Sequence, residues 1–374
     1  MREKLKIAIW MNIPSHYQRA FFEALSTRDC IDLQVRYLEE LPAVRKAQGW
    51  KEQAFLLCEQ CVARISRVED QLETMPDWRE RIHIISCVYS RPLAELLTQH
   101  NVRWCHWSER PGVQLARKLR FNMRLFNWLY PIYLQFKKRE YHLAATSAVA
   151  VFGQGKLAVD AFKGMGINES KIVKLYYTPP ALSRTEPNAD IVRFANGRRV
   201  FLTVCMLNER KGIDLLLRAM ASLKNQGWCL VLCGRDLSSG RLADLAEKLK
   251  LNNDVLFLGA IPFENLNAVY SAADVDILAS RFDGWGAVLN EGASVGLPLI
   301  GSDSAGASWE LICEGENGFR FAAGNWKKLA AAMKHYVDHP ELLKSHGARS
   351  REIFEQGFSP ECNAETVART LAGK

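Results

Sequence analysis

The chain has 374 residues, of which 48% are hydrophobic and 24% charged, and its formal net charge at pH 7 is +8. This composition excludes a disordered chain, and the length favours two domains. No apolar run approaches the roughly 20 residues needed to span a bilayer, so we expect a soluble or peripheral protein.

The ten cysteines are scattered over predicted helices and strands. That distribution is typical of reduced, cytoplasmic thiols and not of a disulfide framework. Cys58 and Cys61 form a C-x-x-C pair on a predicted helix, but no second Cys or His pair lies at zinc-finger spacing. We therefore interpret the pair as packing residues and expect no metal site. The first ten residues, MREKLKIAIW, lead directly into a strand and lack a signal-peptide layout.

The positive charge lies in the first half of the chain. Residues 1–184 carry 28 Lys and Arg against 18 Asp and Glu, whereas residues 185–374 carry 21 against 23. The basic half favours an anionic partner, such as a membrane surface, a lipid diphosphate or an acidic glycan. Nucleic acid is not expected, because no nucleic-acid motif is present.

Strands and helices alternate through the first half, which predicts a parallel sheet covered by helices. The expected strands are 6–11, 33–38, 82–88, 102–107, 148–152 and 172–176. In the mixed segment 39–81 the only assigned element is one helix at about 53–74. Ligands of open parallel sheets bind at the carboxyl ends of the strands. There, His16, Glu109 and Arg110 are candidates for ligand contact, whereas His106 lies within a strand.

Residues 117–142 combine seven Lys and Arg with apolar side chains that lie between them, including Phe121, Leu125, Phe126, Trp128, Leu129 and Tyr130. Basic residues among exposed aromatics are typical of an interfacial helix. The alternative is an apolar stripe that packs on the sheet below a solvated basic face. We favour contact with an anionic membrane, and we expect Pro131 to kink or end the helix.

The second half begins after a polar stretch, 181–196, which we interpret as the interdomain linker. Strands are expected at 199–205, 228–233, 255–259, 275–279, from 299, and at 319–321. The loop MLNERKG at 206–212 follows the first of these strands. A new helix begins at Ile213.

The segment 275–303 carries the pattern of strand, glycine loop, helix and strand. A helix that begins near Gly286 leaves its first N–H groups unpaired, which suits a phosphate. Gly284 and Gly286 allow a ligand to approach the backbone. Asp283 in the loop and Glu291 in the helix can accept hydrogen bonds from sugar and ribose hydroxyls, respectively.

Asp283, Glu291 and the following GASVGLPLIGSD resemble the acidic motif of glycosyltransferase family 4, retaining nucleotide-sugar-dependent enzymes of the GT-B fold. The family usually has Glu at both motif positions, and this chain has Asp at the first. The family's Gly-Arg and Lys-Gly loop is matched in its second half by Lys211 and Gly212. Met206 stands where the family has Arg, and Arg210 is the substitute that we expect.

The resemblance implies an α/β protein with two Rossmann-like doubly wound domains that face a cleft. The expected domains are 1–184 for the acceptor and 185–357 for the nucleotide sugar, with a helix in 358–374 that crosses back onto the first. The resemblance also makes His16, Glu109 and Arg110 candidates for the acceptor side. It also implies the site. Lys211 and Arg210 would bind the leaving diphosphate, Asp283 the donor sugar and Glu291 the ribose. Nucleotide contacts through the backbone are expected from Gly286, Ala287, Val288 and Ile261.

The implied function is retaining transfer of a hexosyl group from a nucleoside diphosphate sugar, with UDP or GDP, to a glycan or lipid-linked acceptor. We expect no cofactor and no obligatory metal, because no DxD-type motif lies near the site. The acceptor would belong to bacterial surface polysaccharide or lipopolysaccharide synthesis, at the inner face of the cytoplasmic membrane. The alternatives are a nucleotide-sugar 2-epimerase and a non-catalytic glycosyltransferase-like subunit, which Met206 and Asp283 would suit.

Overall fold

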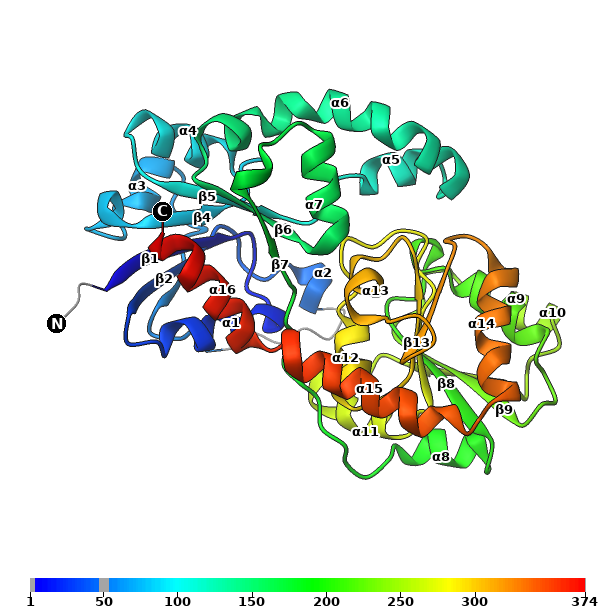
Figure 1. Ribbon diagram of the computed structural model, residues 1–374. Helices are drawn as coiled ribbons and strands as arrows, with labels where there is room; N and C mark the ends of the chain where they lie inside the picture. The colour runs from blue at the N-terminus through cyan, green and yellow to red at the C-terminus, as the bar shows by residue number, and fades with distance from the viewer. Residues whose placement is uncertain (1–3, 47–53, 374) are drawn as a thin grey trace. The chain divides into compact units, whose positions relative to one another are not determined.

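The computed structural model describes residues 4–46 and 54–373, which fall into two compact units (Figure 1). The described residues of 1–111, 129–180 and 360–373 form unit 1, and those of 112–128 and 181–359 form unit 2. Residues 112–128, which we had assigned to the first domain, therefore pack with the second unit. Among the described residues, no helix is both long and apolar enough to cross a membrane.

Unit 1 contains a seven-stranded parallel sheet in the order β3-β2-β1-β4-β5-β6-β7. The strand order reverses between β1 and β4, which is the position where open α/β sheets bind ligands. The strands are β1 (Leu5–Met11), β2 (Ile31–Tyr37), β3 (Glu59–Cys61), β4 (Ile82–Ile85), β5 (Trp104–Ser108), β6 (Ala150–Gln154) and β7 (Ile172–Leu175).

Helices follow the strands of unit 1 along the chain, and the longer ones bury apolar residues. They are α1 (His16–Ser26), α2 (Ala43–Lys46), α3 (Val68–Leu72), α4 (Arg91–Gln99), α7 (Gly155–Gly164) and α16 (Pro360–Ala372), with 3₁₀ turns η1 (Trp78–Glu80) and η2 (Glu169–Lys171). Helix α16 lies beside α1, where Arg28 pairs with Glu365 at 2.6 Å (Figure 1). Ala364, Val367 and Leu371 enter the same core as Phe21 and Phe22.

The basic segment forms two helices, α5 (Val113–Lys118) and α6 (Met123–Ser147). They are separated by a turn in which Arg120 and Phe121 have left-handed φ angles of 48° and 53°. Pro131 lies inside α6 and does not end it. A proline removes one backbone donor but does not abolish a helix when neighbouring turns and packing hold it.

Unit 2 contains a six-stranded parallel sheet in the order β10-β9-β8-β11-β12-β13. The strands are β8 (Arg199–Val204), β9 (Trp228–Cys233), β10 (Val255–Gly259), β11 (Val275–Leu278), β12 (Leu299–Ser302) and β13 (Gly318–Phe321). The helices are α8 (Ala189–Ala195), α9 (Ile213–Ala221), α10 (Arg241–Lys248), α11 (Leu266–Ser271), α12 (Val288–Ser294), α13 (Gly306–Leu311), α14 (Trp326–Asp338) and α15 (Leu342–Gly357), with η3 (Glu209–Lys211) and η4 (Phe263–Asn265). Strand β11 is buried along its whole length, so both faces of the sheet are covered at its centre.

Two sequence-based assignments are wrong. The expected helix at 53–74 is replaced, in its described part, by strand β3 and the short α3, with Cys58 in a turn. Strand β3 forms because Glu59 pairs with Val35 of β2 and its carboxylate binds the Tyr37 hydroxyl, both of which are long-range contacts. The expected linker 181–196 contains α8, whose Ile191 and Ala195 are core residues.

Candidate functional site

The loop after β8 presents Lys211 through a tight turn. The Asn208 side chain accepts a hydrogen bond from the Lys211 N–H at 3.1 Å and so begins the 3₁₀ turn η3. Gly212 follows in the left-handed region, with φ of 69°. A Cβ on Gly212 would lie 2.1 Å from the Ala279 carbonyl oxygen at the end of β11. Only glycine allows this approach without a shift of the backbone, and the approach fixes where Lys211 emerges.

Lys211, Arg210 and Asp283 form one ionic cluster. The Lys211 ammonium lies 2.5 Å from Asp283 Oδ2, and an Arg210 guanidinium nitrogen lies 3.3 Å from Oδ1. The Ser280 hydroxyl donates to Oδ2 at 3.1 Å. The structure therefore joins the two expected diphosphate ligands, Lys211 and Arg210, to the expected sugar ligand, Asp283, which is the counter-ion that the two cations share.

Two opposing effects set the ionisation of Asp283. Burial raises its pKa, but the Lys211 and Arg210 charges and the hydrogen bonds from Lys211 and Ser280 outweigh burial, so that the pKa lies below its usual value. Asp283 is therefore ionised at neutral pH. A cluster of two cations and one carboxylate keeps one net positive charge, which is suited to an anionic ligand.

Arg281 links the two loops of the cluster, and the sequence analysis missed it. Its guanidinium forms a bidentate pair with Asp214, with both distances at 2.7 Å, and donates to the Glu209 carbonyl at 2.8 Å. Its backbone N–H donates to the Arg210 carbonyl. No local pattern identifies this role, because Arg281 and Asp214 are 67 residues apart.

The glycine loop lies between β11 and α12. Gly286 has φ of 105°, and a Cβ there would lie 2.4 Å from the Leu278 side chain. Ala287 is the N-cap of α12 and Val288 its first residue. The first amide groups of a helix have no carbonyl partner within that helix, as the sequence analysis assumed for Gly286, Ala287 and Val288. Ile261, in the loop after β10, is half-buried and packs at the margin of the same unit's core.

Glu291 is the most enclosed of the expected charged site residues, with 1% of its surface exposed. The Tyr270 hydroxyl donates to Oε2 at 2.7 Å, whereas Oε1 is buried and accepts no hydrogen bond from the described residues. Burial raises the pKa of Glu291 to about 7, although Tyr270 and Lys211 act to lower it. Tyr270 is a second contact that the sequence analysis missed.

The acceptor-side candidates lie at the carboxyl edge of the unit 1 sheet. His16 begins α1 with its ring 4.0 Å from that of Tyr17. Glu109 and Arg110 follow β5; Glu109 is exposed, and Arg110 is buried with its guanidinium over the Tyr130 ring. His106 points into the fold, where it is fully buried and contacts the Ser108 hydroxyl and the Cys87 N–H.

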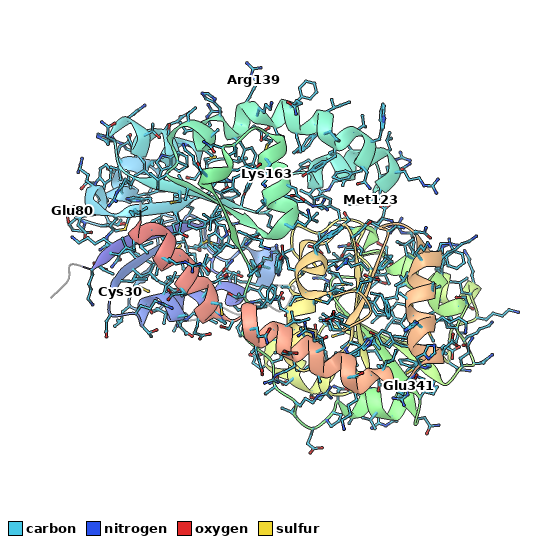
Figure 2. The ribbon with its side chains drawn as sticks, in the orientation of Figure 1. Cys30, Glu80, Met123, Arg139, Lys163 and Glu341 are labelled. Carbon is cyan, nitrogen blue, oxygen red and sulfur yellow. The ribbon has the colours of Figure 1, made fainter. Side chains whose placement is uncertain are left out.

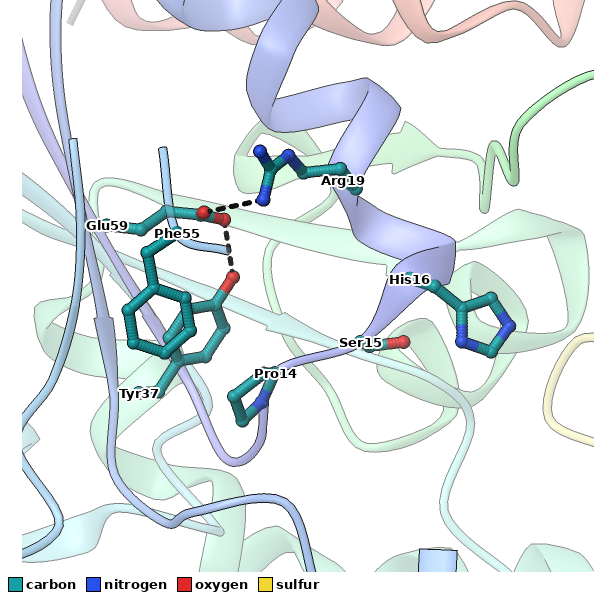
Figure 3. A pocket seen from close by; sticks show the side chains of 7 residues that line it. All are labelled: Pro14, Ser15, His16, Arg19, Tyr37, Phe55 and Glu59. Carbon is teal, nitrogen blue, oxygen red and sulfur yellow. Dashed lines mark hydrogen bonds and ion pairs between the residues drawn. The ribbon is translucent and has the colours of Figure 1, made fainter. Parts of the chain in front are cut away.

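A small pocket next to His16 is lined by Pro14, Ser15, His16, Arg19, Tyr37, Phe55 and Glu59 (Figure 3). Glu59 accepts hydrogen bonds from Tyr37 and Arg19, while His16 points away from that pair. The cavity measures about 20 Å³, enough for one water molecule but not for a sugar ring. We interpret the Glu59 contacts as the reason why β3 joins the sheet.

The comparisons identify the part of the chain that carries Lys211, Asp283 and Glu291. Residues 185–353 match the model of "Glycosyl transferases group 1". This segment is a group 1 glycosyltransferase domain. The match confirms, at the level of group 1, the glycosyltransferase family that the acidic motif predicted. Membership of family 4 stays a prediction. Among the described residues, no group of three or more His, Cys, Asp or Glu side chains is placed to hold a metal ion.

Curated relatives align with about half of the chain. A lipopolysaccharide core biosynthesis mannosyltransferase, LpcC of Rhizobium leguminosarum bv. viciae, is 31% identical over 180 residues, which are 46% of this chain and 50% of that protein. A glycogen synthase of Mycobacterium tuberculosis is 27% identical over 181 residues, 48% of this chain and 44% of that protein. The chain thus spans about half the length of the curated relatives that it matches.

Solved structures match over nearly the whole chain. Anabaena Alr3699/HepE in complex with UDP superposes with a TM-score of 0.75 at 17% identity, covering 99% of this chain and 100% of that one. The lipopolysaccharide outer core galactosyltransferase WaaB has a TM-score of 0.71 at 16% identity, with 99% of each chain covered. The predicted fold class, GT-B with two Rossmann-like parallel-sheet domains, is confirmed.

Proposed function

We propose that the protein is a retaining glycosyltransferase that moves a sugar from a nucleoside diphosphate sugar to a glycan or lipid-linked acceptor. The observation that carries the proposal is the Lys211, Arg210 and Asp283 cluster in the same unit and the same group 1 domain as the buried carboxylate of Glu291. Lys211 and Arg210 share one counter-ion, so their remaining positive charge can bind a diphosphate. The Glu291 carboxylate has one oxygen that can accept a hydrogen bond from a diol. Together they recognise the two ends of a nucleoside diphosphate.

The reaction requires stabilisation of the negative charge that develops on the leaving diphosphate. As the bond between the anomeric carbon and the phosphate oxygen breaks, Lys211 and Arg210 would hold that charge, which is preorganised electrostatic catalysis. The acceptor hydroxyl would form the new bond on the same face of the sugar and pass its proton to the departing phosphate oxygen. Asp283 would then be released from part of its ion pairing and accept hydroxyls of the donor sugar.

The relatives inform the choice of donor and acceptor. Solved structures of Anabaena HepE contain UDP and UDP-glucose, and relatives of the group 1 domain include proteins named for lipopolysaccharide core and colanic acid biosynthesis. On that basis UDP or GDP is the proposed nucleotide. Surface polysaccharide or lipopolysaccharide assembly in bacteria is the proposed setting, at the inner face of the cytoplasmic membrane.

A thermal-shift screen tests the donor site. The screen covers UDP, GDP, ADP and their common sugar conjugates, and we expect one of these nucleotides to raise the melting temperature of the wild type. At a hundredfold excess over the dissociation constant, binding adds about 2.7 kcal/mol to the free energy of unfolding. E291Q should lose that shift. The matched control is E247Q, which alters an exposed glutamate of α10 in the same unit. If no nucleotide shifts the wild type, the non-catalytic alternative becomes the better description.

Helix α6 supports a membrane partner for the enzyme. Leu125, Trp128, Ile132 and Phe136 recur at helical spacing and are 39, 70, 50 and 74% exposed, whereas Phe126, which belonged to the same apolar run, is fully buried. The basic side chains of Arg124, Lys138 and Arg139 are exposed along this helix, and Arg139 projects outward in Figure 2. Apolar side chains beside cations are the composition that binds an anionic lipid interface.

Liposome flotation tests this partner. We expect the wild type to float with vesicles that contain anionic lipid and to float less with neutral ones, since each basic residue near an anionic leaflet adds ~1 kcal/mol. W128S/F136S should weaken binding by roughly a hundredfold, because each large side chain contributes about 1.5–3 kcal/mol of burial. The control is L237S, which removes an exposed leucine elsewhere. Equal flotation of all three proteins would contradict the assignment of this face.

A further inference from the structure

We propose that Tyr270 is a positioning residue of the nucleotide site, which holds one oxygen of Glu291 so that the other oxygen is available to a ribose hydroxyl. The proposal rests on the proposed function and deepens it. It assigns a role to a residue of α11, a helix to which the sequence motifs gave none. The contact spans 21 positions of the chain and joins α11 to α12.

The geometry assigns the two oxygens of Glu291 different tasks. A phenol has one proton to donate, and at 2.7 Å the Tyr270 hydroxyl donates it to Oε2. The Val288 carbonyl, at 3.5 Å from the same hydroxyl, is at the limit of a hydrogen bond. With Oε2 engaged and the helix α12 fixed at Ala287, the carboxylate cannot rotate freely. Oε1 is the oxygen that remains.

The unused oxygen is the second observation. Oε1 is buried and accepts no hydrogen bond from the residues that the structure describes. A buried acceptor without a donor is unfavourable, and the great majority of such groups in native proteins have a partner. A ligand hydroxyl that donates to Oε1 supplies the missing bond. The ribose of a nucleotide carries two adjacent hydroxyls of that kind.

The other groups around Glu291 do not supply this orientation. Lys211 acts on Glu291 through its charge and favours the ionised form. Asp276 of β11 is fully buried, and burial followed by the charge of the nearby Glu291 raises its pKa well above the usual value, which favours its neutral form beside Glu291. Cys233 of β9 is likewise a buried neutral thiol whose pKa is raised, first by burial. Among the described residues, Tyr270 is the neighbour whose side chain donates a hydrogen bond to Glu291.

A purely structural role predicts a different result from a positioning role, and Y270F separates the two. The substitution keeps the fully buried ring and removes only the hydroxyl. Y336F is the matched control, because Tyr336 is also fully buried in unit 2 and its hydroxyl lies 2.9 Å from His346. Both variants lose one buried hydrogen bond, but only Y270F affects Glu291.

The experiment is titration calorimetry of UDP, GDP and their 2′-deoxy and 2′,3′-dideoxy forms from pH 5.5 to 8.5. We expect Y270F to weaken the preferred ribonucleotide roughly tenfold, the usual effect of one hydrogen bond to a charged group. It should leave the dideoxy form almost unchanged, because that form has no hydroxyl for Oε1. Y336F should bind both forms as the wild type does.

The pH profile gives an independent readout. The wild-type affinity should rise with pH through about 7, as Glu291 loses its proton and becomes a full acceptor. Because the Tyr270 hydrogen bond lowers the pKa of Glu291, its loss in Y270F should move that midpoint to higher pH. Difluorotyrosine at position 270 donates more strongly and should move the midpoint to lower pH, which provides a test even if Y270F does not fold.

Two results would overturn the proposal. An unchanged affinity and midpoint in Y270F would show that the hydroxyl does not act on the site. An equal loss for ribo- and dideoxynucleotides would show that the hydroxyl only supports the fold. If the wild type binds no nucleotide at all, the proposed function fails and this role fails with it. If the wild type binds a nucleotide and Y270F has the same affinity and the same pH midpoint, only the role of Tyr270 is refuted.

Discussion

Replacement of Lys211 by alanine is expected to reduce turnover at least about a hundredfold while the protein stays folded. Loss of one contact to a developing anion costs about 2.7–4 kcal/mol of barrier stabilisation, and each 1.36 kcal/mol is tenfold in rate. Lys211 is placed for that contact by Asn208 before it and Gly212 after it. The measurement is kcat with the donor that the nucleotide screen selects, next to the melting temperature of each protein.

The ionic cluster determines how this variant must be controlled. The Asp283 carboxylate keeps Arg210 and Ser280 as partners when Lys211 is removed, so a moderate loss of stability is expected. K211M keeps most of the apolar stem and separates packing from charge. K211A/D283N removes the cation and the anion together and should recover stability but not turnover. K248A, on the exposed end of α10, should behave as the wild type. Near-normal turnover in a folded K211A would refute the role of Lys211.

Local pattern predicted the elements that carry the site because the site lies on a repeated unit of the fold. The buried runs at β8 and β11, the glycines after them and the helices that follow are all readable from the sequence. That information places Lys211 and Asp283 in the loops that follow β8 and β11, and Glu291 in the helix α12 that follows the second loop. The GT-B class was implied by the family resemblance, and the solved structures confirmed it.

The sequence did not predict which distant residues contact Asp283 and Glu291, and these contacts change the roles expected of both. Asp283 was expected as a ligand of the donor sugar, but in the structure it is first the counter-ion of Lys211, which lies 72 positions earlier. Glu291 was expected to accept from ribose, and in the structure its Oε2 already accepts a hydrogen bond from Tyr270, which lies 21 positions earlier. Neither pairing leaves a trace in local periodicity, because each is produced by the register of β8 against β11 or by the packing of α11 on α12.

The sequence also did not predict which side of helix α6 faces the solvent. Composition indicated a basic, aromatic segment at 117–142, but it did not give the phase of the helix. Packing decides that phase: Phe126 lies against Phe282 in unit 2, with ring centroids 5.5 Å apart, and Trp128 is consequently directed outward. The side chains available to a membrane are therefore fewer than the composition suggested.

Gly212→Ala should have a large effect on both stability and turnover, because two separate costs coincide at this position. An alanine would occupy the left-handed region at φ of 69°, which costs roughly 1–2 kcal/mol. Its Cβ would also lie 2.1 Å from the Ala279 carbonyl oxygen and 3.3 Å from Leu215. The backbone must move to relieve the first contact, and such overpacking lowers the free energy of unfolding by about 1–3 kcal/mol. The displaced turn carries Lys211, so turnover should fall at least about tenfold.

Gly227 provides the matched control for this prediction. It has a comparable φ of 77°, but a Cβ there would have no heavy atom within 4 Å. G227A should therefore show only the conformational cost, with a small decrease in melting temperature and unchanged turnover. The difference between the two variants isolates the contact between the Lys211 turn and the end of β11. If G212A and G227A lower stability equally and both retain full turnover, then the close approach of these two loops does not position Lys211.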